Sequence, residues 1–189
     1  MAFRPFKSPV MALLVILLSG ALTFERAFGD EYGWLPNFRE IIDNGRNEIL
    51  LSGYAWHDPA TYDTAARSRL NPYALGGGYA RYIVNPDGST EMLSALAFSD
   101  SYRKPQITAE YNKYWSAKLS DNLSFGLGYT VGFSRREDAF HGLPEPIALP
   151  LGAIKVGDRF HIYVSYIPPL PKSFGVRGDV AIIFAGIDF

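Results

Sequence analysis

The stretch LSFGLGYTVGFS, residues 123–134, alternates large apolar residues with small ones along its whole length. Because successive side chains of a β-strand point to opposite faces, the alternation predicts a strand with one apolar face and one nearly empty face. A half-buried strand of a soluble sheet would carry charged or large polar groups on its second face. We therefore expect something other than water on the side of the small residues.

The rest of the chain divides into short alternating segments of the same kind, separated by turn sequences such as NPDG at 85–88. Short turns alternate with longer connections rich in polar residues and proline, as in outer-membrane barrels. The chain is therefore predicted to be all-β, an eight-stranded antiparallel outer-membrane β-barrel over 49–189. The expected strands are, approximately, 50–56, 77–84, 91–98, 107–119, 123–135, 146–156, 159–167 and 177–189.

A soluble eight-stranded barrel that holds a ligand, like a lipocalin, is the alternative for the same strands. Such a barrel would carry polar residues on its outer face. The odd positions from Leu123 to Phe133 carry no charge, and the even positions from Phe160 to Tyr166 repeat the apolar pattern. The pattern favours lipid outside, and a closed barrel leaves lipid no unpaired strand edge.

The first residues have the organisation of a secretory signal peptide, expected over 1–29. Arg4 and Lys7 precede an apolar run at 10–22, and the small residue Gly29 follows at the expected cleavage site. The alternative is an anchoring helix, but the run is shorter than the roughly 20 residues that a bilayer span needs.

Residues 30–48 are expected to form an N-terminal amphipathic helix at the membrane interface. Trp34 and Phe38 fall near one face of such a helix, with charged residues on the other. A frayed leader is the alternative for a segment that contains Pro36 and Gly45.

The composition excludes two classes of protein. The net charge is −1 and basic residues are not concentrated, so no nucleic-acid partner is expected. The chain has no cysteine, which excludes a disulfide framework. Stability must come from packing, hydrogen bonds and the surrounding lipid.

The even positions of the opening stretch are candidates for lining a ligand slot. Gly126, Gly128, Thr130 and Gly132 would face the interior, where a slim apolar guest such as an acyl chain would fit. The alternative is that glycine there relieves crowding between strongly tilted strands. The residues alone leave both interpretations open.

Several motifs, in this order and approximate spacing, resemble the PagP family of lipid A palmitoyltransferases. The resemblance covers nearly all of the expected mature chain and implies transfer of a palmitoyl-like acyl chain from a glycerophospholipid to lipid A, remodelling the lipopolysaccharide of the cell outer membrane. The motifs are YAWHDPATYD (54–63), LGGGYA (75–80), ALAFSDSY (95–102), FGLGYTVG (125–132), LPEPIALPLGAIKVG (143–157) and YIPP (166–169).

By this resemblance, His57, Asp100 and Ser101 match the positions that the family needs for activity. A neutral imidazole suits the general base, so His57 is the candidate. Ser101 is either a nucleophile or a hydroxyl that stabilises the oxyanion or positions the donor. Asp100 is expected to orient His57, which requires both Asp100 and Ser101 to lie where a strand gives way to a loop. Without the resemblance, an interface histidine and a plain turn would be the simpler interpretations.

The resemblance also assigns Pro150 and Pro168 to lateral lipid access, because proline leaves a ladder position unpaired. The chain departs from the family at Ser52, where relatives carry a proline. It departs again at 109–112, which includes the position that measures the acyl chain; Glu110 or Asn112 there would shorten the slot.

The expected partners are a phospholipid acyl donor, lipid A as acceptor and the outer-membrane lipids, with the protein acting as a monomer. No residues have metal-ligand spacing, so no metal and no other cofactor is expected; His161 is expected to be a packed or solvated imidazole. The alternative function is that of a non-catalytic small outer-membrane barrel that binds lipid or a surface partner.

Seven basic residues would pair with lipid phosphates if they gather at the outer rim, and are otherwise solvated loop charges: Arg67, Arg69, Arg81, Arg103, Lys104, Arg135 and Arg136.

Overall fold

The structure is a computed structural model that describes residues 36–137, 142–169 and 178–189. The expected signal peptide at 1–29 lies outside the described residues.

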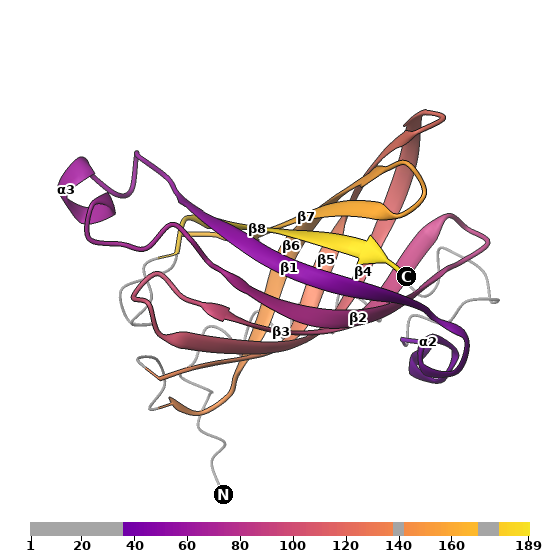
Figure 1. Ribbon diagram of the computed structural model, residues 1–189, viewed down its shortest axis with the longest axis horizontal. Coiled ribbons are helices and arrows are strands. Elements are labelled where there is room, and N and C mark those ends of the chain that lie inside the picture. Colours follow the sequence, from indigo (N-terminus) through magenta and orange to yellow (C-terminus); the bar gives the residue numbers. More distant parts are fainter. Residues whose placement is uncertain (1–35, 138–141, 170–177) are drawn as a thin grey trace, which may run out of the picture. The chain divides into compact units, whose positions relative to one another are not determined.

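Eight antiparallel strands close into one barrel, in which each strand pairs with the next and β8 pairs with β1 (Figure 1). The predicted fold class is thereby confirmed. The strands are β1 (Arg46–His57), β2 (Gly76–Val84), β3 (Ser89–Ser99), β4 (Pro105–Ser120), β5 (Leu123–Arg136), β6 (Glu145–Val156), β7 (Phe160–Ile167) and β8 (Val180–Asp188).

The two ends of the barrel differ in their connections. Short turns join β2 to β3, β4 to β5 and β6 to β7 at one end, which we call the turn end. At the other end, which we call the loop end, longer connections follow β1, β5 and β7, and a turn joins β3 to β4. The β1–β2 connection contains a short helix, α3 (Thr64–Arg67).

A short helix, α2 (Phe38–Asn44), precedes β1 and packs against β2 and β3. Its N-cap, Asn37, accepts a hydrogen bond from the backbone of the first turn, and Ile41 is fully buried. The expected amphipathic helix is thus present, but within the described residues it is shorter than 30–48. Arg81 lies beneath it and donates to the Gly45 carbonyl at 2.7 Å, so Arg81 belongs to the helix contact and not to the outer rim. Among the residues described, no helix is both long enough and apolar enough to cross a membrane.

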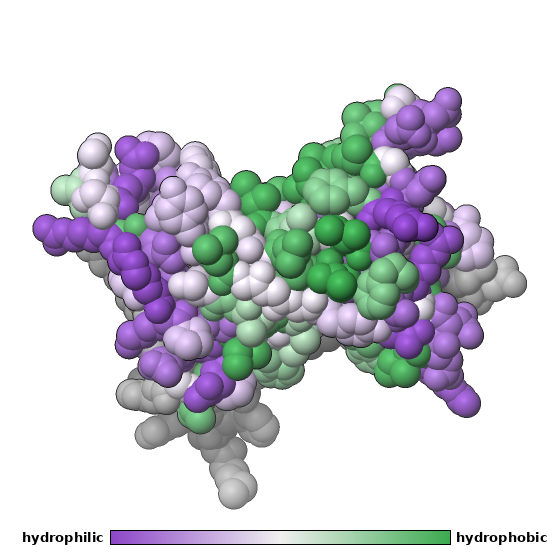
Figure 2. Space-filling view, in the orientation of Figure 1, coloured by the Kyte–Doolittle hydropathy of each residue, from purple (hydrophilic) through white to green (hydrophobic). Residues whose placement is uncertain are grey.

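The outer face of β5 is the apolar face predicted from the opening stretch. Leu127 is 60% exposed, and large apolar side chains at the other odd positions are exposed or partly exposed. Figure 2 shows a band of apolar residues across the middle of the barrel, with hydrophilic residues gathered toward both ends. An apolar band flanked by polar ends is the surface that a membrane-spanning barrel presents to lipid.

The inner face of β5 lies very close to β4. A Cβ added to Gly128 would overlap the Lys113 carbonyl and stand 2.5 Å from Tyr114 Cα, and one at Gly132 would stand 2.8 Å from Glu110 Cα. A Cβ at Gly126 would stand 2.8 Å from the Tyr114 ring. Glycine therefore relieves crowding at these positions, as the alternative interpretation of the sequence held. The role of Gly126, Gly128, Thr130 and Gly132 in lining an acyl slot stays a prediction.

We expect Gly128→Ala to lower the free energy of unfolding by about 1–3 kcal/mol, because the new methyl group must push apart the backbones of β4 and β5. Urea unfolding of the protein refolded in lipid vesicles measures the change. Gly53→Ala is the matched control, since a Cβ there meets no atom within 4 Å. Equal stability of the two variants would contradict the crowding assigned to Gly128.

Candidate active site

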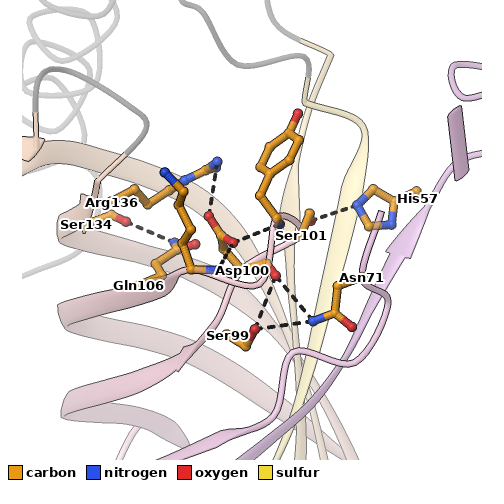
Figure 3. Close-up of polar contacts among 10 residues, drawn as sticks. His57, Asn71, Ser99, Asp100, Ser101, Gln106, Ser134 and Arg136 are labelled. Atoms are coloured by element: carbon orange, nitrogen blue, oxygen red, sulfur yellow. Dashed lines mark hydrogen bonds and ion pairs between the residues drawn. The ribbon is translucent and has the colours of Figure 1, made fainter. Parts of the chain in front are cut away.

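An imidazole and a hydroxyl meet at the loop end of the barrel. His57 is the last residue of β1, and Ser101 lies in the turn that follows β3. The His57 Nε2 atom and the Ser101 Oγ atom are 2.9 Å apart, and Figure 3 shows the two side chains pointing toward each other. His57 is buried and Ser101 half-buried. This distance is within the reach of a base that activates a nucleophile.

The carboxylate of Asp100 holds the turn that carries Ser101. Asp100 Oδ1 accepts hydrogen bonds from the backbone amides of Tyr102 and Lys104, each at 2.8 Å, and Oδ2 lies 3.5 Å from the Arg136 guanidinium. The carboxylate points away from His57 (Figure 3). Within the described part of the chain, no hydrogen bond or ion pair links Asp100 to His57. The structure therefore makes Asp100 a residue that shapes the turn, in place of the expected orientation of His57.

Asn71 braces the same turn from the β1–β2 connection, a role that the sequence did not reveal. Its backbone amide donates to the Ser101 carbonyl at 2.8 Å. Its side-chain amide nitrogen lies 3.3 Å from Ser99 Oγ and 3.4 Å from the Asp100 carbonyl (Figure 3). An asparagine before a proline signals only a turn in the sequence, so nothing local points to a partner 30 residues away.

We expect Asp100→Ala to lower the transfer rate by about 100-fold, because loss of both amide contacts frees the turn and displaces Ser101. Asp100→Asn keeps an oxygen for the two amides and loses only the charge that faces Arg136, so its loss should be smaller, while Arg136→Gln also removes the guanidinium from the Tyr102 ring and should lose at least as much as Asp100→Asn. Initial rates with a phospholipid donor, on protein shown to be folded, measure the three variants. If Asp100→Asn is as inactive as Asp100→Ala, the carboxylate does more than hold the turn.

A second set of contacts supports His57 from the side of β8. The ring of Tyr62 packs edge-on against His57 with centroids 5.2 Å apart, and the Tyr62 hydroxyl donates to the Gly178 carbonyl at 2.7 Å. The next residue, Asp179, accepts hydrogen bonds from Thr61 Oγ1 and from the Tyr166 hydroxyl. These bonds, first from Thr61 and then from Tyr166, hold the pKa of the Asp179 carboxyl below its usual value.

We expect Asp179→Asn to lower the transfer rate by less than about 100-fold, the loss that a 1 Å displacement of a reacting group causes. The reason is that the substitution weakens only the hydrogen bonds around Asp179 and leaves His57 itself in place. Asparagine tolerates the positive φ of 62° at this position, so the substitution tests the charge. Because the pKa of Asp179 is lowered, its charged form is present at neutral pH and is lost only as the pH falls through the lowered pKa. The rate ratio of wild type to variant should therefore stay constant from pH 8 down to about 5. A ratio that changes in this range would contradict the assignment.

The two prolines assigned to lipid access lie where β6 and β7 separate. The β6–β7 ladder begins at the Leu151–Ser165 pair, one residue past Pro150, and Pro168 directly follows β7. Within the described residues, the part of β6 from 145 to 150 pairs only with β5. Among the described residues, β6 and β7 are therefore not paired with each other between Leu151 and the loop end of the barrel.

Ser52 stands on the other side of the barrel, where the β1–β2 ladder ends at the Ser52–Gly76 pair. Its hydroxyl donates to the Ala74 carbonyl at 2.6 Å, and the Ala55 amide donates to the Pro72 carbonyl at 2.8 Å. These two bonds tie β1 to the chain before β2. A proline at 52 has no hydroxyl and could not form the first of them.

The interior below the His57–Ser101 pair contains polar side chains from β4. The Glu110 carboxylate accepts a hydrogen bond from Thr130 Oγ1 at 3.4 Å, and Asn112 donates to Ser94 Oγ at 2.9 Å. Asn112 is fully buried. Both candidates for the residue that measures the acyl chain thus face inward with partners.

An apolar outer band, a closed eight-stranded barrel and an imidazole–hydroxyl pair at one end define a membrane-embedded barrel enzyme. A family model described as "Antimicrobial peptide resistance and lipid A acylation protein PagP" matches residues 37–185. The "Lipid A acyltransferase PagP" of Bordetella pertussis (strain CS) is 32% identical over 145 residues, 77% of this chain and 76% of the relative. That of Legionella longbeachae serogroup 1 is 32% identical over 156 residues, 78% of this chain and 67% of the relative. The chain belongs to the PagP family and is an acyltransferase.

Proposed function

We propose that this protein moves a palmitoyl-like acyl chain from a glycerophospholipid to a hydroxyl of lipid A, as a monomer in the cell outer membrane. The observation that carries the proposal is the 2.9 Å contact between His57 Nε2 and Ser101 Oγ at the loop end of a barrel of the PagP family. The phospholipid donor and the lipid A acceptor would both be drawn from the membrane that surrounds the barrel.

The same contact favours Ser101 as the nucleophile. In the tautomer whose Nε2 is unprotonated, the Ser101 hydroxyl donates its one proton to His57, and that proton is not available to an oxyanion. His57 accepts this proton as Ser101 Oγ attacks the ester carbonyl, and returns it to the departing oxygen of the lysophospholipid. In the second half-reaction His57 takes the proton of the lipid A hydroxyl, which attacks the acyl-serine, and returns it to Ser101 Oγ.

Lipid reaches the pair through the interrupted β6–β7 ladder beside Pro150 and Pro168. The support for this route is the ladder itself, which stops at the Leu151–Ser165 pair. On the β1–β2 side the hydroxyl of Ser52 adds a bond to Ala74, so that side is less suited to lipid passage.

Expression in a host that lacks such an enzyme tests the proposal. Mass spectrometry of lipid A should show one added acyl chain with the wild-type protein and none with folded Ser101→Ala, and the added mass gives the chain length. Unmodified lipid A with a correctly inserted wild-type barrel would favour the non-catalytic alternative. Intact-protein mass spectrometry with donor alone tests the acyl-serine, which Ser101→Ala cannot form.

A further inference from the structure

A cluster of buried ionisable side chains lies inside the barrel at the turn end, opposite the His57–Ser101 pair. It joins Glu48 of β1, His161 of β7 and Asp188 of β8, whose side chains are 0%, 3% and 11% exposed. His161 Nδ1 is 2.7 Å from Glu48 Oε1 and 3.7 Å from Asp188 Oδ1. One donor atom from each residue lies within 4.8 Å of the other two.

A glycine and two tyrosines lie directly against the carboxylates of this cluster. Gly186 faces the Glu48 carboxylate so closely that a Cβ there would overlap Glu48 Oε1, and the carboxylate would have to shift from its present place. The Tyr163 hydroxyl lies 3.2 and 3.0 Å from the two Glu48 oxygens, and the Tyr82 hydroxyl donates to Asp188 Oδ2. Hydrogen bonds of this kind orient ligating side chains in metal sites.

The cluster has an unsatisfied atom and an excess of negative charge. Asp188 Oδ1 is buried and, among the described residues, has no hydrogen-bond partner. Buried polar atoms without a partner are rare in folded proteins. The carboxylates of Glu48 and Asp188 share one imidazole, and the positive charge of Arg46, which is exposed at the start of β1, interacts with the Tyr82 hydroxyl. A divalent cation would satisfy both the free oxygen and the charge.

We propose that Glu48, His161 and Asp188 bind a zinc ion. One imidazole nitrogen and two carboxylate oxygens suit Zn²⁺, whereas Ca²⁺ and Mg²⁺ prefer oxygen ligands throughout. The three ligands come from β7, β8 and β1, so the ion ties together the first and last strands where the barrel closes. Bound zinc therefore stabilises the closure of the barrel, at the end away from the acyl-transfer chemistry.

Zinc binding is tested on untagged full-length protein, refolded in detergent and stripped with a chelator. Equilibrium dialysis against Zn²⁺ should give one ion per chain for wild type and for His57→Gln, which removes an imidazole at the other end. Asp188→Asn and His161→Gln should each bind at least 10-fold more weakly. Absence of stoichiometric zinc in the wild type, or undiminished binding by His161→Gln, would overturn the proposal.

Two further measurements use only the wild-type protein, so they do not depend on whether a variant of the cluster folds. Cobalt added to the stripped wild type should produce visible absorption bands that one equivalent of zinc abolishes. Zinc should also raise the urea midpoint of the wild type, because a ligand that binds only the folded state stabilises it. A featureless cobalt spectrum, or a midpoint unchanged by zinc, would contradict the site. Activity enters none of these readouts, so the proposed function is tested separately.

Discussion

His57→Ala is expected to lower acyl transfer by at least about 100-fold while the barrel stays folded, because it removes the general base. Ser101→Ala should lower it at least as far, since the hydroxyl 2.9 Å from His57 Nε2 is then missing. Neither side chain forms part of the apolar outer band, so the eight-stranded ladder should persist. Initial rates with a phospholipid donor and lipid A, on protein whose fold is verified by circular dichroism, measure the effect.

Ser68→Ala is the matched control for the serine variant. Its hydroxyl lies in the same loop end and bonds the Ala65 carbonyl at 2.9 Å, with no contact to His57 among the described residues. The control should retain the wild-type rate. Folded His57→Ala that transfers acyl chains at the wild-type rate would remove His57 from the chemistry, even though the family assignment would stand.

Leu127→Arg is expected to lower the free energy of unfolding by about 2–4 kcal/mol, because it places a guanidinium in the hydrocarbon part of the bilayer. Leu127 is 60% exposed and lies in the middle of β5, on its apolar outer face. Urea unfolding in lipid vesicles measures the change, and the yield of membrane-inserted protein gives an independent readout.

Leu119→Arg separates the membrane effect from a general effect of charge. Leu119 is similarly exposed, at 65%, but lies beside the β4–β5 turn, where the cost of arginine falls to about 0–1 kcal/mol. Equal losses in the two variants would contradict the depth assigned to Leu127. A Leu127→Arg variant as stable as wild type would mean that this face does not contact lipid.

The strands could be predicted because their signal is local. Each strand of a membrane barrel alternates between lipid and interior, so the period of two in residues 123–134 marks β5 without knowledge of its neighbours. The predicted strands all appear, with ends that differ by a few residues because caps and turns set the exact boundaries. Within the described residues the helix before β1 spans Phe38–Asn44, and it stops short of the expected end at 48 because β1 already begins at Arg46.

The glycines of β5 illustrate the limit of a local pattern. An empty face in the sequence is compatible with a slot for a guest or with a neighbouring backbone that occupies the space. At Gly128 the β4 backbone lies too close for a Cβ, and that distance depends on the tilt and coiling of the closed barrel, whereas the lining of an acyl slot by these glycines stays a prediction.

The residues by themselves determined that this chain is a barrel with a lipid-facing exterior, and the family resemblance selected His57, Asp100 and Ser101. Only the tertiary structure showed that His57 meets Ser101 across 44 positions of sequence and that Asp100 turns to Arg136. It also brought Glu48 to His161, 113 positions away, although neither has a neighbouring ligand in the sequence. The physical reason is ring closure: pairing β8 with β1 makes neighbours of the two ends of the chain, and no periodicity records which side chains then meet.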